Sequence, residues 1–316
     1  MFLRSKTSEL DLSKLNTSNV TDMYGMFQQN EATQLNVSGF DTSNVTTMRF
    51  MFFQSKAREL DLSNFDTSNV TDMFGMFENS KATKLNVSSF DTRNVTDMGR
   101  MFDRVQATQL NISNFDTSNV TNMSLMFNHS EATSLDLSNF NTSNVTNMSS
   151  MFLNSKAREL NLSSFDTRKV TDMSNMFYFS QATELDLSSF EISSDTNIAN
   201  MFRSSRATIG FAKTREYADR LNNSTGKPEK LNFVVKGLPN ISFEKNGDDN
   251  FQKTHRTKVG VEIPKADIES LEYIWTTSET PPENGWMPFE INDEIIHSSG
   301  SGDYYLHVRA TSSIGK

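Results

Sequence analysis

Carboxylate and amide side chains recur at a fixed interval along the first two thirds of the chain, in a pattern that could bind a cation. Oxygen atoms are the ligands that Ca²⁺ prefers. Neutral asparagine stands at two of the positions, however, and short polar side chains in tight corners satisfy backbone groups that the turn leaves unpaired. We therefore interpret the column as corner residues and predict no metal and no cofactor, with calcium binding as the lesser alternative. The column comprises Asn16, Asp41, Asp66, Asp91, Asp116, Asn141 and Asp166.

Methionines, threonines and asparagines recur at the same interval and suggest further chemistry. Thioether sulfur is a weak metal ligand, and methionine at helical spacing is far more often core filler. Threonines such as Thr46 and Thr71 resemble a regular ice-binding array, but the neighbouring charges Asp22 and Asp72 argue against a weakly hydrated face. The Asn-x-Thr sequences, as at Asn69, matter as glycosylation sites only in a eukaryotic secretory pathway. We interpret these columns as structural.

The composition offers no set of residues for catalysis. Cysteine is absent, the four histidines fall in no metal-ligand spacing, and the chain has no phosphate-binding glycine loop. We therefore predict that the protein is not an enzyme. The net charge of -9 argues against nucleic acid and anionic membrane as partners. No apolar run approaches the roughly 20 residues that span a bilayer, so we expect no direct membrane insertion.

The polar columns belong to a repeat of the whole sequence. Eight copies at constant period indicate a solenoid, in which each unit buries its apolar face only by stacking on its neighbours. The repeat is marked by Leu-x-(Leu/Val/Ile)-Ser tetrads, 25 residues apart, that begin at Leu10, Leu35, Leu60, Leu85, Leu110, Leu135, Leu160 and Leu185.

Within one unit, the apolar positions predict two elements. Leu60 and Leu62 alternate as in a short strand. Met73, Met76 and Phe77 follow at spacings of three and four, which favour one short α or 3₁₀ turn. Each coil should then contain a short parallel strand, a polar corner, a second extended piece and a helical turn that leads to the next strand.

The last unit of the repeat differs from the others and indicates where the stack ends. Asp195 stands in the valine column, where a charge is acceptable only at the end of a core. The segment Thr214–Leu221 predicts a short amphipathic helix, and we expect a helical cap near residues 214–222 to close the solenoid. We therefore assign residues 1–228 to the solenoid. The sequence begins in mid-repeat, so we expect a longer parent chain whose N-terminal cap, signal and anchor precede or follow this segment.

Residues 229–316 lack the repeat and predict an antiparallel all-β domain. Short strand candidates are separated by Gly, Pro, Asn and Asp. Tyr304 lies in a Gly-x-Tyr-x-apolar sequence typical of the tyrosine corner of immunoglobulin-like domains, and Trp275 or Trp286 would be the buried tryptophan of the core. We expect an immunoglobulin-like β-sandwich. The candidate strands are 232–235, 241–245, 258–263, 271–276, 287–291 and 304–310.

The repeat unit at Leu60–Phe77, written LDLSNFDTSNVTDMFGMF, closely resembles the BspA-like surface-protein repeat, a bacterial relative of leucine-rich repeats. The resemblance implies a solenoid of leucine-rich-repeat type. It also implies an exported protein at the bacterial cell surface or outside the cell, in a family of which several members are implicated in adhesion. Residues 271–276 and 302–310 look like the small immunoglobulin-like modules that form stalks in such proteins. The resemblance supplies no catalytic residues.

If the recurring positions are structural, binding should lie where the coils differ. Two positions between the paired methionines of each coil, and two after the methionine-phenylalanine pair, vary from coil to coil; we call these columns the variable flank. Large apolar side chains gathered on a surface suggest a contact site, although they could also cover the flank or vary neutrally. The predicted partner-binding residues are Tyr24, Phe50, Phe53, Phe74, Leu125, Leu153, Tyr178 and Phe179.

These observations predict a non-catalytic adhesion or recognition module. Solenoids commonly present an extended surface to their ligands, so we expect the variable flank to bind a host or environmental protein or glycan. The alternative is a structural spacer or stalk that displays another domain. The substitutions Phe53→Glu and Tyr178→Glu would separate the two functions. Only a recognition module is expected to lose binding while its folding is unchanged.

Overall fold

The computed structural model describes residues 2–236, 240–244, 255–262, 268–290, 293–297 and 305–312. The chain divides into two compact units, Met1–Phe233 and Val234–Lys316. The sequence had set the boundary after residue 228. The first unit extends further because strand β7 (Asn232–Val235) joins the last sheet of the repeat region, in the order β5-β6-β7.

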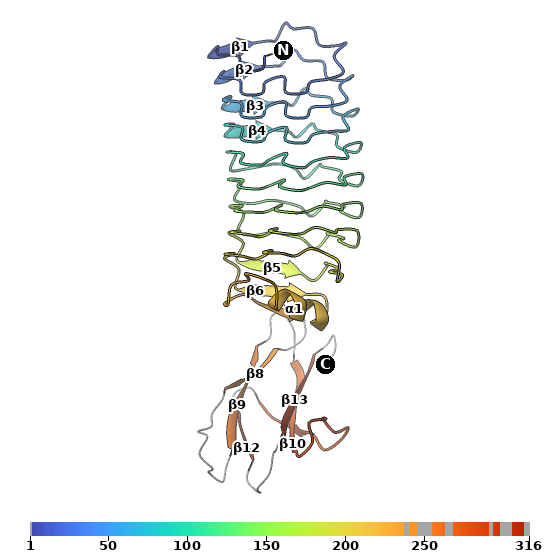
Figure 1. The fold of residues 1–316 in the computed structure, drawn as a ribbon, viewed down its shortest axis with the longest axis vertical. Helices are drawn as coiled ribbons and strands as arrows, with labels where there is room; N and C mark the ends of the chain where they lie inside the picture. The colour runs from blue at the N-terminus through green and yellow to red at the C-terminus, as the bar shows by residue number, and fades with distance from the viewer. Residues whose placement is uncertain are drawn as a thin grey trace. The chain divides into compact units, whose positions relative to one another are not determined.

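The first unit is a β-solenoid of 25-residue coils (Figure 1). Short strands lie at the same place in successive coils and pair in parallel, with Leu10 opposite Leu35 and Leu60 opposite Leu85. A second line of parallel bridges runs from Asp22 to Asn197, again with one residue from each coil. The strands are β1 (Glu9–Asp11), β2 (Gln34–Asn36), β3 (Glu59–Asp61), β4 (Lys84–Asn86), β5 (Glu184–Leu187) and β6 (Ile209–Ala212).

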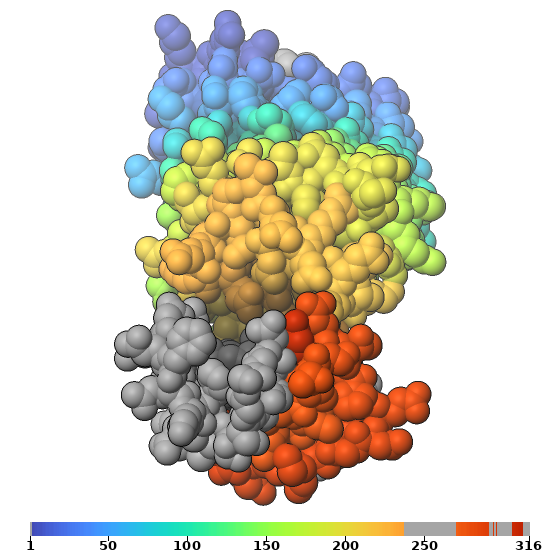
Figure 2. Space-filling view, turned by 60° about the horizontal axis from the view of Figure 1, so that its bottom comes forward, coloured from blue at the N-terminus to red at the C-terminus, as the bar shows by residue number. Residues whose placement is uncertain are grey.

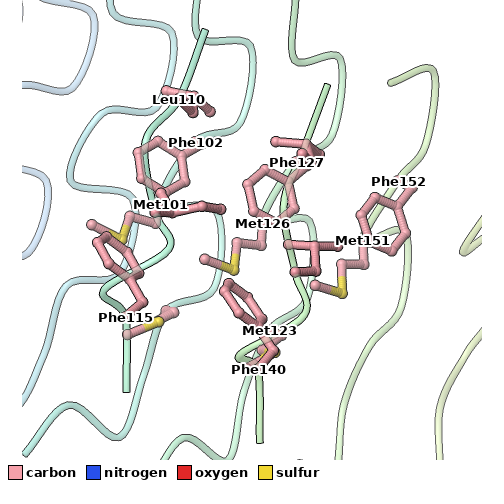
Figure 3. Packing of buried hydrophobic residues seen from close by; sticks show 14 of the residues in the cluster. Met101, Phe102, Leu110, Phe115, Met123, Met126, Phe127, Phe140, Met151 and Phe152 are labelled. Carbon is pink, nitrogen blue, oxygen red and sulfur yellow. The ribbon is translucent and has the colours of Figure 1, made fainter. Parts of the chain in front are cut away.

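The core consists of columns of identical side chains. Figure 3 shows the rings of Phe102, Phe127 and Phe152 in a row across the view, each beside the methionine of its own coil. The ring of Phe102 lies 5.7 Å from those of Phe77 and Phe127, with interplanar angles of 10° and 7°. These side chains are completely buried. The repeat therefore specifies its core by stacking like on like, as a solenoid requires.

The sequence predicted a short α or 3₁₀ turn in each coil, and this prediction is wrong. In the described part of the first unit, the segment around the two methionines forms consecutive turns instead. Phe50 and Phe52 donate their N–H groups to carbonyls of the next coil, at 3.0 and 2.8 Å, whereas Met51 and Phe53 donate to the third residue before them, at 3.1 and 3.0 Å. A helix would need all of these groups within one coil. Two left-handed residues in each coil, such as Phe50 and Gln54, also interrupt any right-handed helix.

The repeated polar residues hold successive coils together at the corners. The Thr67 hydroxyl is fully buried; it donates to the Asp91 carbonyl at 2.9 Å and accepts from the Asp91 N–H at 2.8 Å. Asn69 donates to the Ser43 carbonyl of the preceding coil at 2.7 Å, and Asp66 accepts from the Ser68 N–H within its own corner. The interpretation of the acidic column as corner residues agrees with this geometry.

Replacing Thr67 with valine should lower the free energy of unfolding by about 1–3 kcal/mol. The change preserves the shape of the side chain but leaves two backbone groups of Asp91 without their partner. Thr71 is the matched control: it is exposed, and its hydroxyl donates to Thr46 at 3.3 Å. Thr71→Val should change stability by less than about 0.5 kcal/mol. Urea denaturation measures both, and equal effects would contradict the role given to the buried hydroxyl.

Helix α1 (Arg215–Asn222) follows the last coil, where the sequence predicted a helix over Thr214–Leu221. Thr214 accepts from the Tyr217 N–H as N-cap, and Ala218 and Leu221 are buried against the solenoid core. In Figure 2 the segment around α1, in orange, lies over the last coils, in yellow. Arg220 donates to carbonyls of the irregular eighth coil, including those of Ile192 and Thr196 at 3.0 and 2.7 Å. Asp195 in that coil is exposed.

The second unit contains two three-stranded antiparallel sheets in its described part. Their orders are β11-β10-β13 and β12-β9-β8. Leu271, Phe289, Ile295 and Ala310 form a small core that takes residues from both sheets. The strands are β8 (Asn240–Glu244), β9 (His255–Glu262), β10 (Ile268–Thr276), β11 (Met287–Pro288), β12 (Glu294–His297) and β13 (Tyr305–Ser312).

The two tryptophans of the second unit occupy different environments. Trp275 stands opposite Leu306 across β10 and β13 and packs against the small core. Trp286 is also half-buried, with the Arg309 guanidinium 4.2 Å from its ring. Trp275 is therefore the core tryptophan of the two candidates. The predicted tyrosine corner at Tyr304 lies outside the described residues. The sequence missed β12, where only Ile295 and Ile296 stand among charged neighbours.

Candidate binding site on the solenoid flank

Four of the predicted aromatic residues meet on the variable flank. The Phe50 ring lies 6.0 Å from Tyr24, 5.5 Å from Phe53 and 5.3 Å from Phe74, in edge-to-face arrangements. Tyr24 is 56% exposed, and the other three are half-buried. Together with three polar side chains they line a hollow of about 270 Å³, which we call the aromatic depression. Its lining is Tyr24, Gln28, Phe50, Phe53, Phe74, Glu78 and Arg100.

Glycines in neighbouring coils make room for these rings. A Cβ atom on Gly75 would lie 2.4 Å from the Phe50 ring, and one on Gly99 would lie 2.9 Å from the Phe74 ring. Phe50 itself has a φ of 55°, in the column where Gly25 and Gly75 stand in the adjacent coils. Every coil has a left-handed residue in this column, so the conformation is a feature of the repeat, and a bulky side chain adopts it at an energetic cost.

Arg49 covers one side of the aromatic group. Its guanidinium carbon lies 4.1 Å from the centre of the Phe74 ring and 5.1 Å from that of Phe50. The same guanidinium pairs with Asp72 at 3.3 Å and with Asp97 at 3.9 Å. Burial and the neighbouring Asp72 raise the pKa of Asp97. One positive charge therefore faces two carboxylates and two ring faces.

A second arginine, Arg100, forms the same kind of group with two carboxylates and lines the aromatic depression itself. Arg100 pairs with Glu78 at 3.2 Å and with Asp103 at 3.1 Å. Asp103 is 1% exposed and accepts from the Asn128 amide at 2.9 Å, and Arg104 lies 3.6 Å from it. Burial and the Glu78 charge raise the pKa of Asp103 to about 6, even though both arginines oppose the shift. Burial also raises the pKa of Glu78.

The free energy of unfolding of the solenoid should therefore depend on pH through the protonation of Asp103. Because its pKa rises from 3.8 unfolded to about 6 folded, the folded state binds more protons between these values. Its contribution to stability thus falls as pH rises from about 4 to about 6, by about 2–3 kcal/mol. The Asp103→Asn variant has no carboxyl group at this position, so its stability should not fall between about pH 4 and 6. The free energy of unfolding of the variant should therefore increase relative to that of the unchanged chain across this interval.

Asp116 offers a control of opposite sign. Hydrogen bonds from Ser118 lower the pKa of Asp116, so its contribution to stability is present above about pH 4 and disappears in acid. Asp116→Asn should accordingly be less stable than the unchanged chain at neutral pH and equal to it in acid. Urea denaturation across the pH range measures both variants. A stability difference for Asp103→Asn that does not change between pH 4 and 6 would contradict the assignment.

The other predicted residues do not join the aromatic depression. Tyr178 and Phe179 form a separate pair, with ring centres 4.7 Å apart and the Arg203 guanidinium 5.9 Å from the Tyr178 ring. Phe179 is 47% exposed and left-handed. Leu125 and Leu153 are half-buried and line neither group. The prediction thus resolves into one group of four aromatic residues and one pair.

Sequence reasoning missed the charged members of the site. Arg49, Glu78 and Arg100 stand in the same variable columns as the aromatic residues, which was the available signal. Asp103, the partner of Arg100, lies three residues further on in the same coil and also stands in a variable column, whereas Asp72, the partner of Arg49, comes from the next coil, and that pairing becomes visible only when the coils are stacked. Selecting residues by the size of an apolar side chain finds the rings but not the charged side chains beside them.

Other hollows of the solenoid are larger but more polar. One, of about 810 Å³, lies over the first three strands and is lined mainly by polar residues such as Glu9, Asp11 and Arg58. Its side chains bond to each other, as Asn36 does to Asp11 at 2.9 Å. Within the described residues, no group of three His, Cys, Asp or Glu side chains could hold a metal ion. The helix in the described part of the chain is neither long nor apolar enough to cross a membrane.

Comparison with known proteins identifies the repeat region. No curated protein and no solved structure matches the chain. A protein-family model matches twice, over residues 1–115 and 96–211, and the two matches together span residues 1–211. That span includes the aromatic depression and ends in the last coil, at β6. The chain therefore belongs to the family described as Mycoplasma protein of unknown function, DUF285.

Proposed function

We propose that this protein is a non-catalytic recognition module that binds a macromolecule through the aromatic depression on the variable flank of its solenoid. The observation that carries the proposal is the aromatic depression, in which an exposed tyrosine and three half-buried phenylalanines surround a hollow. Aromatic residues dominate the energetics of protein interfaces.

The resemblance of the repeat to BspA-like surface proteins gives the proposal its setting. It suggests a leucine-rich-repeat-type surface protein of a bacterium, with adhesion to a host or environmental protein or glycan as its role. The two antiparallel sheets of the second unit and their shared core are compatible with an immunoglobulin-like stalk. In this proposal the second unit carries the solenoid away from its point of attachment.

Binding of the labelled chain to an array of matrix proteins and glycans tests this function. The chain should bind at least one class of array member, and the double variant Tyr24→Ala/Phe53→Ala should bind at least tenfold more weakly. Phe179→Ala removes an exposed aromatic residue from the separate pair and is the matched control, with binding unchanged. Circular dichroism and thermal unfolding establish that all variants remain folded.

Two results would contradict the proposal. Binding that survives the double variant would move the interface away from the aromatic depression. An array on which the chain binds nothing would favour a spacer that displays another domain.

A further inference from the structure

The aromatic depression is next to two arginine-carboxylate groups in which carboxylates outnumber guanidiniums. In one, Arg49 faces Asp72 and Asp97. In the other, Arg100 faces Glu78 and Asp103. Arg104, 3.6 Å from Asp103, is the one further cation in these pairs. The surroundings of the rings therefore keep a negative excess, in a chain whose net charge is -9.

The rings of the site already accept one cation. The Arg49 guanidinium lies 4.1 Å from the centre of the Phe74 ring, well within the roughly 6 Å at which a ring face attracts a positive charge. The rings of Tyr24 and Phe53 border the hollow itself. Glu78 also lines it, and its side chain is 12% exposed. A cation that enters the hollow would therefore meet aromatic rings and the Glu78 carboxylate, which it would share with the Arg100 guanidinium 3.2 Å away.

We propose that the aromatic depression receives one basic side chain, lysine or arginine, from a protein partner, with its alkyl stem against Tyr24 and Phe53 and its charge at Glu78. This inference rests on the proposed function and names the chemistry of the partner. The hollow of about 270 Å³ falls below the roughly 300–1,000 Å³ of small-molecule sites and suits a single inserted side chain. An anionic group fits poorly, since Arg49 and Arg100 are each already paired with two carboxylates.

The state of Glu78 supports this choice of partner. Its pKa is raised because burial outweighs the attraction of Arg100, so the existing pair leaves the carboxylate incompletely stabilised. A second cation would favour the ionised form and offset the burial. Binding of a basic side chain should therefore weaken as pH falls through the range in which Glu78 and Asp103 take up protons.

A pair of short peptides tests the inference on the full chain. The probes are acetyl-Gly-Gly-Lys-Gly-Gly-amide and the same peptide with uncharged norleucine in place of lysine. In proton NMR titrations, the lysine methylene resonances should move upfield, because they enter the shielding region above the rings. The norleucine peptide should bind at least fivefold more weakly, and added salt should weaken the lysine peptide alone.

Single-residue variants test whether the lysine peptide binds at the aromatic depression. Glu78→Gln should weaken the lysine peptide at least fivefold, and Tyr24→Ala should do the same at a position that is mostly exposed and tolerates truncation. Glu159→Gln removes an exposed carboxylate elsewhere on the solenoid and should leave binding unchanged. Equal affinity for the two peptides, or equal affinity before and after Glu78→Gln, would overturn the inference.

The array experiment distinguishes two outcomes: that the site does not take a basic side chain, and that the aromatic depression is not a binding site at all. A partner that is lost with Tyr24→Ala/Phe53→Ala but retained with Glu78→Gln would keep the recognition site and exclude a basic side chain as its occupant. Selective binding of the lysine peptide that disappears with Glu78→Gln supports the inference whichever macromolecule carries the side chain.

Discussion

Replacing Phe102 with alanine is expected to lower the free energy of unfolding by about 3–5 kcal/mol. The ring is completely buried and lies between Phe77 and Phe127, 5.7 Å from each. Truncation loses both stacking contacts and leaves a cavity that rigid neighbouring coils cannot fill. In a solenoid each coil contacts only its neighbours, so one weak coil also uncouples the coils on its two sides. Urea denaturation followed by circular dichroism measures the loss.

Phe179→Ala is the matched control for this prediction. That ring is 47% exposed, and its truncation should cost less than about 1 kcal/mol. If the two variants lost similar stability, the phenylalanine column would not be the principal core of the solenoid. If the Phe102→Ala variant unfolds in two steps, one at a lower urea concentration than the other, the coils on the two sides of Phe102 unfold separately, as the loss of coupling predicts.

Replacing Gly75 with alanine should also be strongly destabilising, by about 2 kcal/mol or more. Gly75 has a φ of 60°, a conformation that costs other residues about 1–2 kcal/mol. Its new Cβ would also lie 2.4 Å from the Phe50 ring, so the ring would have to leave its place among Tyr24, Phe53 and Phe74. The variant should therefore lose binding as well as stability.

The Phe50→Ala background separates the two causes. Without the ring, Gly75→Ala keeps its backbone strain but loses the clash, so its cost should fall toward about 1 kcal/mol. The interaction free energy between the two positions is read from the double-mutant cycle. Equal costs in the two backgrounds would show that the glycine is needed only for its backbone conformation, and that Phe50 does not depend on it for space.

The repeat period and the core columns could be predicted because stacking places chemically identical residues in identical surroundings. Met76 and Phe77, named from their spacing, are both completely buried. The local backbone was not predictable from that spacing. Side chains three and four residues apart fit a helical turn, yet they also fit consecutive turns whose alternate N–H groups reach the next coil. The glycines and asparagines in the Phe50 column, such as Gly25, Gly75 and Asn175, were the signal for left-handed residues.

The candidate site was predictable only in part, for a related reason. Tyr24, Phe50, Phe53 and Phe74 stand out in the sequence as large residues in variable columns. Their closeness depends on stacking, which the constant period implies. The charged groups depend on side-chain directions that cross between coils, as in the pairing of Arg49 with Asp72. Leu125 and Leu153 stand in the same variable columns but do not line the aromatic depression, so apolar size alone does not indicate which residues gather there.

Hydroxyl-radical footprinting of the chain, free and bound to its partner from the array, shows whether the aromatic depression is the surface that contacts the partner. Oxidation reports the exposure of individual side chains in both states. We expect Tyr24 and Phe53 to become protected on binding, whereas Phe179 in the separate pair and Met287 in the second unit, which is 46% exposed, should stay unchanged. Protection of Phe179 or Met287 with no change at Tyr24 and Phe53 would contradict this expectation and place recognition elsewhere on the chain.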